Sequence, residues 1–231
     1  MSTTTRQNDP CLLDTQRNHT FFLEWRVTST KLIQELTQLQ EQLVSAGEGS
    51  VVVLDSCASH NLHITMNECR LPRITDPQEA ETRKELLLEV IKRLEDYWTK
   101  RVDRCLVDSQ EADHLEVQCK GLRTFRNSVV YVPVEGPGVD VLNKVYEEVE
   151  DLLLEQGVEP IRVGQTFTPH ITIAKATKKN KLPEAVWTLI EAPDVQSTVH
   201  GTQSLEEIVF CLKRLKTEPS PPVLMRMKFA P

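Results

Sequence analysis

The apolar positions along the chain change their spacing several times, and each spacing predicts a different element. Residues 21–27 are apolar and aromatic over the length of a strand. Over residues 29–44, leucine and isoleucine recur at three- and four-residue intervals, so we expect a helix with one buried face and a serine or threonine N-cap. Residues 61–66 predict a strand, and residues 77–98 predict a long amphipathic helix that opens at a proline.

A second series of the same kind begins near residue 113. Residues 114–134 predict two strands around a turn at Arg126–Asn127. A helix over residues 139–157, which Gly157 ends, is expected next. The remaining expected elements are a strand at 168–175, a short helix at 181–191 and closing strands within 205–216 and 223–231.

Both series have the order strand–helix–strand, which indicates an internal duplication. We therefore expect an α+β fold in which a single bilobal domain covers residues 19–231. Its two lobes run roughly over 19–112 and 113–231, with exchange of strands between them left open. Residues 1–18 are polar and show no apolar period, and we interpret them as a flexible tail.

The strands at 61–66 and 168–175 contain the same letters, His-Ile-Thr. The polar residues of the two copies are His63, Thr65, His170 and Thr172. Because side chains alternate along a strand, the histidine and threonine of each copy share one face and the isoleucine points to the other. If the lobes pack with twofold pseudo-symmetry, both pairs converge on one groove. A single copy would more often be structural, but two copies in matching contexts indicate a site.

Two imidazoles and two hydroxyls suit transesterification or hydrolysis at phosphorus without a metal. One histidine can accept a proton from the attacking hydroxyl or water while the other donates one to the leaving oxygen. The threonine hydroxyls can donate hydrogen bonds to the phosphate oxygens, where charge develops. The motifs leave open which histidine is the base.

The amino-acid composition limits the classes of ligand that the protein could bind. The 231 residues carry a formal charge of −7, so a long duplex is an unsuitable partner, whereas a short oligonucleotide or nucleotide in a local pocket is compatible. No apolar run is long enough to span a membrane, and the first residues do not resemble a signal peptide. Six dispersed cysteines without a CxxC pair suit reduced thiols. We expect a monomer in the cytoplasm or nucleus.

The paired motifs resemble those of the two-histidine (2H) phosphoesterases, in which two H-x-[ST]-hydrophobic motifs lie in a duplicated α+β fold. The resemblance covers about residues 20–231 and implies two mainly antiparallel sheets that flank a central groove, with helices outside. "FTPHITIAK" and "GLRTFRNSVVY" are similar to the branch that contains the A-kinase anchor protein gamma isoforms. The chain departs from that branch by carrying Arg123 and Arg126 in place of glycines.

The resemblance implies cleavage of 2′,5′-linked oligoadenylates, with opening of 2′,3′-cyclic phosphates or RNA-end processing as alternatives and no cofactor. A nucleotide-binding or scaffold module without turnover is the rival interpretation. Around the motifs, the candidate substrate-binding residues are Phe125, Arg126, Arg123 and Lys175. Cys57, His60 and His63 have a spacing that could suggest zinc, but a second half of ligands is missing, so we expect no metal site.

Overall fold

The computed structural model describes residues 3–6, 20–71, 77–102, 115–161, 166–177, 181–212 and 223–228. Within these residues, every strand pairing is antiparallel, and the strands form an open sheet in the order β1-β12-β11-β2-β4-β9-β7-β5-β10. The bounds are β1 (Thr3–Arg6), β2 (Thr20–Arg26), β3 (Val51–Val52), β4 (His63–Arg70), β5 (Glu116–Lys120), β6 (Arg123–Phe125), β7 (Val129–Glu135), β8 (Glu159–Pro160), β9 (His170–Ala176), β10 (Val199–Ser204), β11 (Glu207–Leu212) and β12 (Val223–Lys228).

The sheet consists of two halves whose strands are joined through a single residue pair. One half holds β1, β12, β11, β2 and β4, and the other holds β9, β7, β5 and β10. The pairing of β4 with β9 consists of a single residue pair, Ile64 with Ile171. The expected fold of two mainly antiparallel sheets is therefore confirmed, with the two sheets meeting at one point.

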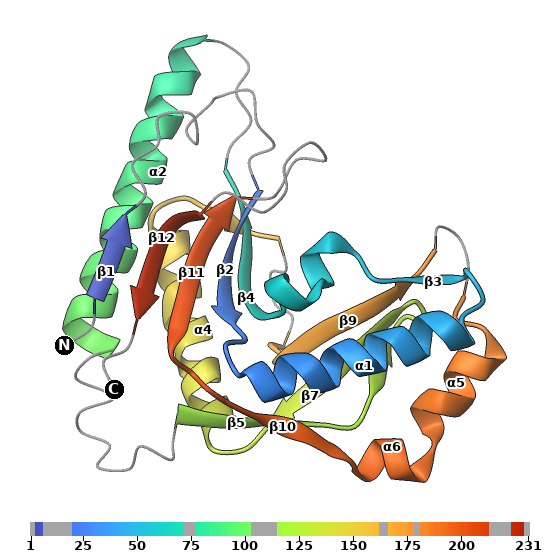
Figure 1. Ribbon diagram of the computed structural model, residues 1–231. Helices are drawn as coiled ribbons and strands as arrows, with labels where there is room; N and C mark the ends of the chain where they lie inside the picture. Colours follow the sequence, from blue (N-terminus) through green and yellow to red (C-terminus); the bar gives the residue numbers. More distant parts are fainter. Residues whose placement is uncertain are drawn as a thin grey trace.

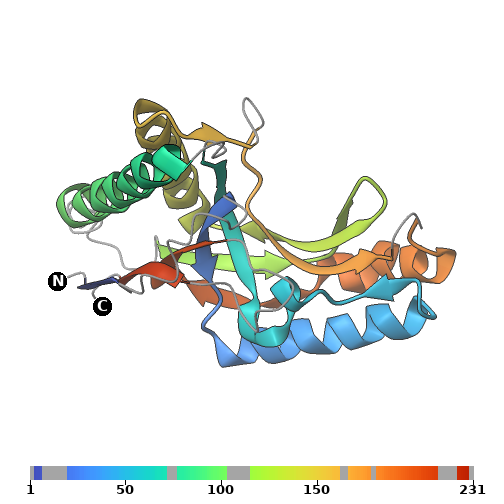
Figure 2. The ribbon, with the colours of Figure 1, turned by 90° about the horizontal axis from the view of Figure 1, so that it is seen from above.

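Helices cover both sides of the strands (Figures 1 and 2). The helices are α1 (Thr30–Ala46), α2 (Pro77–Tyr97), α4 (Gly138–Glu155), α5 (Glu184–Glu191) and α6 (Pro193–Ser197). Helix α1 begins at the expected N-cap, where the Ser29 hydroxyl accepts a hydrogen bond from the Leu32 amide. Figure 2 shows α1 on one side of the strands and α2 with α4 on the other.

Several elements pack in the half of the sheet that is built mainly from the other part of the sequence. Strands β11 and β12 come from the end of the chain but join the half that contains β2 and β4. Helix α1 precedes β4 in the chain, yet it packs mainly on β9 and β10 of the other half, where the Gln40 amide donates to the Ile173 carbonyl at 3.0 Å. The halves of the sheet thus do not follow the 19–112 and 113–231 division of the sequence, and strand exchange is the reason.

Three expectations need correction. Residues 3–6 were expected within a tail, but they pair with β12 as β1, because backbone hydrogen bonds to a sheet edge require no apolar pattern. The first of the two strands expected within 114–134 is divided into β5 and β6, because Gly121 adopts φ +67 and breaks the extended run. Strand β10 was not expected, since its buried positions include His200 and Gln203 rather than apolar residues alone.

None of the helices in the described part of the chain has the length and apolar character that a membrane crossing requires. The closing strands are shorter than the segments that predicted them, and residues 213–222 and 229–231 lie outside the described residues. Most of residues 1–18 lie outside them as well.

Candidate active site

The two His-Ile-Thr motifs lie side by side at the seam between the halves of the sheet. Ile64 and Ile171 are paired and buried, so the residues on either side of each isoleucine project from the opposite face. In antiparallel register, His63 lies at the level of Thr172, and Thr65 lies at the level of His170. This pairing brings together the four residues that the sequence singled out.

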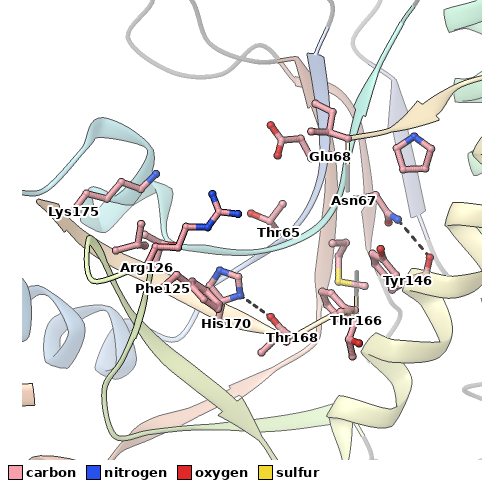
Figure 3. A pocket seen from close by; sticks show the side chains of 16 residues that line it. Thr65, Asn67, Glu68, Phe125, Arg126, Tyr146, Thr166, Thr168, His170 and Lys175 are labelled. Carbon is pink, nitrogen blue, oxygen red and sulfur yellow. Dashed lines mark hydrogen bonds between the residues drawn. The ribbon is translucent and has the colours of Figure 1, made fainter. Parts of the chain in front are cut away.

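A pocket of about 500 Å³ opens beside this seam (Figure 3). Thr65, His170 and Thr172 line it, whereas His63 does not. Figure 3 shows His170, Arg126, Phe125 and Lys175 toward one end and Asn67 with Tyr146 of α4 toward the other. A volume of this size is in the range of cavities that hold small ligands.

The two histidine rings are held in the same way. His63 Nδ1 lies 2.7 Å from the carbonyl oxygen of Asn61, and His170 Nδ1 lies 2.6 Å from that of Thr168. A carbonyl oxygen only accepts hydrogen bonds, so each Nδ1 must carry the hydrogen. In the neutral ring, Nε2 is then the atom with the lone pair, which is the state that a general base requires.

The His170 ring also contacts two aromatic rings. The centroid of Phe125 lies 4.9 Å away and that of Tyr131 lies 5.1 Å away, both in edge-to-face arrangements. These two rings stack on each other at 4.0 Å. Phe125 lines the pocket, and because its ring is packed against Tyr131 and His170, it fixes the orientation of the His170 ring.

The turn expected at Arg126–Asn127 joins β6 to β7. Both residues have positive φ, +51 and +55, which is the geometry of a type I′ hairpin turn. The turn brings Arg126 to the pocket, where Lys175 of β9 also lies. Arg123, the other candidate arginine, is exposed on β6 and is not among the residues that line the pocket.

The opposite end of the pocket contains residues that the sequence analysis did not single out. Tyr146 and Phe167 stack face to face with centroids 4.5 Å apart. The amide of Asn67 donates to the Tyr146 carbonyl at 3.4 Å, which ties β4 to α4. Tyr146 lies on the apolar stripe of its helix, so its sequence position indicated only a role in the core.

His63 has an acidic neighbour that the sequence could not reveal. Glu24 Oε1 of β2 lies 3.4 Å from His63 Nε2, and Glu24 Oε2 lies 3.0 Å from Arg26 Nη2. Glu24 is 4% exposed. The contact depends on an extra residue, Met66, in β4: Leu23 pairs with Asn67 and Glu24 with Thr65. Such a bulge reorients the neighbouring side chains.

The cysteines of the described residues are buried and unpaired. Burial raises the pKa of Cys69 and of Cys119 to about 12, so both thiols are protonated at neutral pH. Cys57 is buried while His60 is exposed. Among the residues that can be placed, no three His, Cys, Asp or Glu side chains gather in a way that could hold a metal ion.

Comparison with known proteins connects this geometry to a family. The sequence model of the AKAP7 2′5′ RNA ligase-like domain matches residues 19–220. An RNA 2′,3′-cyclic phosphodiesterase of Aeropyrum pernix is 25% identical over 169 residues, which cover 71% of this chain and 79% of that protein.

Two solved structures are similar in fold. The protein TT0787 of Thermus thermophilus has a TM-score of 0.53 and 18% identity, with 90% of this chain and 97% of that chain covered. The LigT protein of E. coli, solved in a complex with ATP, has a TM-score of 0.50 and 15% identity, with 91% and 97% covered. At these identities the likeness is one of fold.

Proposed function

The chain belongs to the AKAP7 2′5′ RNA ligase-like family of 2H phosphoesterases and is a phosphodiesterase of this type, and we propose that it cleaves short RNA-like substrates by histidine acid–base catalysis. The observation that carries the proposal is the pairing of Ile64 with Ile171, which places both His-Ile-Thr motifs at one seam beside a pocket. The nucleotide-binding module without turnover needs no such pair of matched imidazoles.

In the proposed reaction, one histidine accepts the proton of the attacking hydroxyl through Nε2, and the other donates a proton to the leaving oxygen. Thr65 and Thr172 donate hydrogen bonds to the non-bridging oxygens of the phosphate, where charge builds in the transition state. Arg126 and Lys175, at the same end of the pocket as His170, attract the phosphate. The stacked rings of Tyr146 and Phe167 provide an apolar surface for a base at the other end.

For the linkage, we propose 2′,5′-linked oligoadenylate as the substrate. The support is the match to the family model over residues 19–220 and the resemblance of "FTPHITIAK" and of the Arg126–Asn127 hairpin to the anchor-protein branch. A pocket with a cationic end and an aromatic end suits a phosphate joined to a nucleoside.

Opening of a 2′,3′-cyclic phosphate at an RNA end is the second candidate. The relative in Aeropyrum pernix has that name, and Arg126 adds a positive charge to the pocket where the anchor-protein branch has glycine. A guanidinium favours a substrate that carries more phosphate groups.

The test is a panel of 2′,5′- and 3′,5′-linked oligoadenylates and RNAs ending in 2′,3′-cyclic phosphate, incubated in the presence of a chelator and analysed for products. We expect the 2′,5′ isomer to be cleaved faster than the 3′,5′ isomer. Cyclic-phosphate opening that outpaces 2′,5′ cleavage by orders of magnitude would replace the first candidate by the second. Nucleotide binding without turnover of any substrate would favour the module that only binds.

A further inference from the structure

The half-sheet that carries His170 continues past β7 to β6, and the pairing across these strands relates β6 to the site. Thr172 of β9 is paired with Tyr131 of β7, and Tyr131 is paired in turn with Arg123 of β6. Residues directly opposite each other in antiparallel strands project from the same face of a sheet. Arg123 therefore shares the face of Thr172, two strands away and about 10 Å from it between Cα atoms.

Two aromatic rings occupy the surface between these positions. The rings of Phe125 and Tyr131 stack with centroids 4.0 Å apart, and each meets the His170 ring edge to face. Phe125 follows Arg123 by two residues on β6, so both side chains project from the same face of the strand, and Phe125 lines the pocket. The aromatic pair therefore connects the pocket with the position of Arg123.

The guanidinium of Arg123 is not held by the protein. Arg123 is exposed, and none of the residues that the structure describes forms a hydrogen bond or ion pair with its side chain. By contrast, the guanidinium groups of Arg26 and Arg226 lie 3.0 Å and 2.9 Å from glutamate oxygens. An arginine without a carboxylate partner, on the face that carries the motif threonines, is available to bind a phosphate group through its planar fork of donors.

The charges around the pocket favour this direction for an anionic chain. Arg126 and Lys175 line the pocket on the side of the β6–β7 hairpin (Figure 3). Glu68, the acidic residue among the described residues that line the pocket, belongs to β4, which lies on the other side of β9. A nucleic acid that leaves the pocket over β6 therefore moves away from Glu68 and passes the three cations Arg126, Lys175 and Arg123.

We propose that Arg123 is a second phosphate-binding residue, outside the pocket, for the internucleotide phosphate next to the one at the two His-Ile-Thr motifs. This inference rests on the proposed function and narrows its substrate class to oligonucleotides with at least two internucleotide phosphates. The nucleoside between the two phosphates lies over the Phe125 and Tyr131 rings, where stacking adds to binding without selecting a sequence. A dinucleotide, which has a single internucleotide phosphate, does not reach Arg123.

Chain length provides the test. The KM of the 2′,5′-linked adenylate dimer is divided by the KM of the trimer, which adds one internucleotide phosphate. We expect a ratio of about five or more for the wild-type protein, the upper range for an exposed charged pair, and a ratio about fivefold lower for Arg123→Ala. A wild-type ratio near one, or a ratio that Arg123→Ala leaves unchanged, would overturn the inference.

Arg126→Ala is the matched control, since it removes the same charge from the same hairpin. Arg126 lines the pocket, at the phosphate that both substrates possess, so KM should rise for dimer and trimer alike and the ratio should stay at the wild-type value. Arg93→Ala, which removes an exposed arginine of α2, controls for net charge and should alter neither KM. An equal fall of the ratio in all three variants would show that net charge retains the chain and would also overturn the inference.

Two modified trimers show whether the charge of the second phosphate is recognised. Each carries one ordinary 2′,5′ linkage and one uncharged methylphosphonate, placed either before or after it. On the wild-type protein, both should have a KM close to that of the dimer, and Arg123→Ala should not change it further. A modified trimer with the low KM of the ordinary trimer would mean that the third nucleoside is bound and the second phosphate is not.

A measurement without turnover separates this inference from the proposed function. The dimer and trimer of 2′,5′-linked 3′-deoxyadenylate lack the 3′-hydroxyl that would attack phosphorus, and calorimetry gives their Kd values. The trimer should bind the wild-type protein about fivefold more tightly than the dimer, and Arg123→Ala should largely remove this difference. If that result holds while no oligonucleotide is cleaved, the proposed function fails and the second phosphate site stands. If cleavage proceeds but the trimer has no advantage in binding, the inference alone fails.

Discussion

The chemistry proposed for the site depends on a few side chains whose rings are held in place by their neighbours. Each histidine donates through Nδ1 to the carbonyl two residues before it, an arrangement set by the backbone that leads into each strand. What differs between them is contributed by other strands: Glu24 at His63, and Phe125 with Tyr131 at His170. Substitutions of the two histidines should therefore affect turnover rather than folding.

Replacing either motif histidine by alanine should reduce the single-turnover rate on adenylyl-2′,5′-adenosine by at least about 10²-fold, the low end for a general acid or base. The double variant should cost much less than the product of the two single losses, because the two groups act as a unit. Thr65→Ala and Thr172→Ala should each cost less than the histidines. A well-folded His63→Ala protein with near-normal turnover of this substrate would contradict the catalytic interpretation.

The two arginines of the β6–β7 hairpin provide an internal comparison. Arg126 lines the pocket and Arg123 does not, so Arg126→Ala should raise KM by about tenfold, equivalent to about 1.4 kcal/mol. Arg123→Ala, at an exposed position, should change KM by no more than about twofold. Steady-state kinetics on the same substrate measures both. Equal effects of the two substitutions would show that the hairpin acts only through its net charge.

Local backbone geometry and burial, rather than apolar pattern, determine several connections between elements. Gly121 separates β5 from β6, and its amide donates to the Thr198 carbonyl at 3.0 Å, which anchors β10. The polar side chain of His200 in β10 is buried. The side chain of Gln203 in the same strand accepts hydrogen bonds from the Thr28 and Ser29 amides at the start of α1. This corner of the fold is where stability should be most sensitive to small changes.

Gly121→Ala should destabilise the protein by more than Gly157→Ala. Both glycines have similar positive φ, +67 and +71, so the backbone strain of an alanine, about 1–3 kcal/mol, is common to both. Only at Gly121 would the new Cβ also crowd a neighbour, 2.9 Å from the Gln196 carbonyl oxygen, while nothing lies within 4 Å at Gly157. Urea unfolding of the two variants measures the difference. Equal costs would mean that the Gln196 segment shifts freely.

His200 should make stability depend on pH. Burial lowers the pKa of His200 below its usual value of 6.5, so the unfolded chain binds this proton more readily than the folded protein does. The contribution of the neutral His200 to the free energy of unfolding is fully present above pH 6.5 and is lost as the pH falls toward the pKa of His200 in the folded protein. His200→Asn should flatten the decline in stability below pH 6.5, as measured by unfolding at several pH values. The exposed His60, replaced in the same way, serves as the control.

The whole molecule depends on how two half-sheets are joined. Their strands meet at one residue pair, Ile64 with Ile171, and helices from each part of the sequence cross over to the other half. Both isoleucines are almost completely buried, directly beneath the site. The same contact therefore holds the halves together and sets the level of the two His-Ile-Thr motifs.

Ile64→Ala and Ile171→Ala should each lower the free energy of unfolding by about 2–5 kcal/mol, the usual cost of truncating a buried isoleucine. Because the two residues are in contact, the costs should not add. The control pair is Ile171→Ala with Ile208→Ala, since Ile208 lies on β11, three strands from β9. These should add within about 0.5 kcal/mol. Additive costs at the seam would show that each half-sheet unfolds independently of the other.

The sequence alone determined the features that depend on near neighbours in the chain. Alternation along a strand put the histidine and threonine of each motif on the face opposite the isoleucine, and helical spacing predicted α1, α2 and α4. The Arg126–Asn127 turn was also predictable, because asparagine tolerates the positive φ of a tight hairpin. The resemblance of the paired motifs to the family was also visible from these short stretches of sequence.

Contacts between distant segments were decided by the tertiary structure only. Glu24 reaches His63 because β2 pairs with β4 in a register that includes a bulge at Met66, and no spacing within the sequence encodes that register. Strand β10 was not predicted because its buried residues, His200 and Gln203, are polar; the Gln203 side chain accepts hydrogen bonds from the Thr28 and Ser29 amides just before α1. Helix α1 itself packs on β9 and β10, although β2 and β4, its neighbours in the chain, lie in the other half-sheet. Pairing between strands is set by the summed packing of the molecule, so the unequal surroundings of two identical motifs emerged only once the chain was folded.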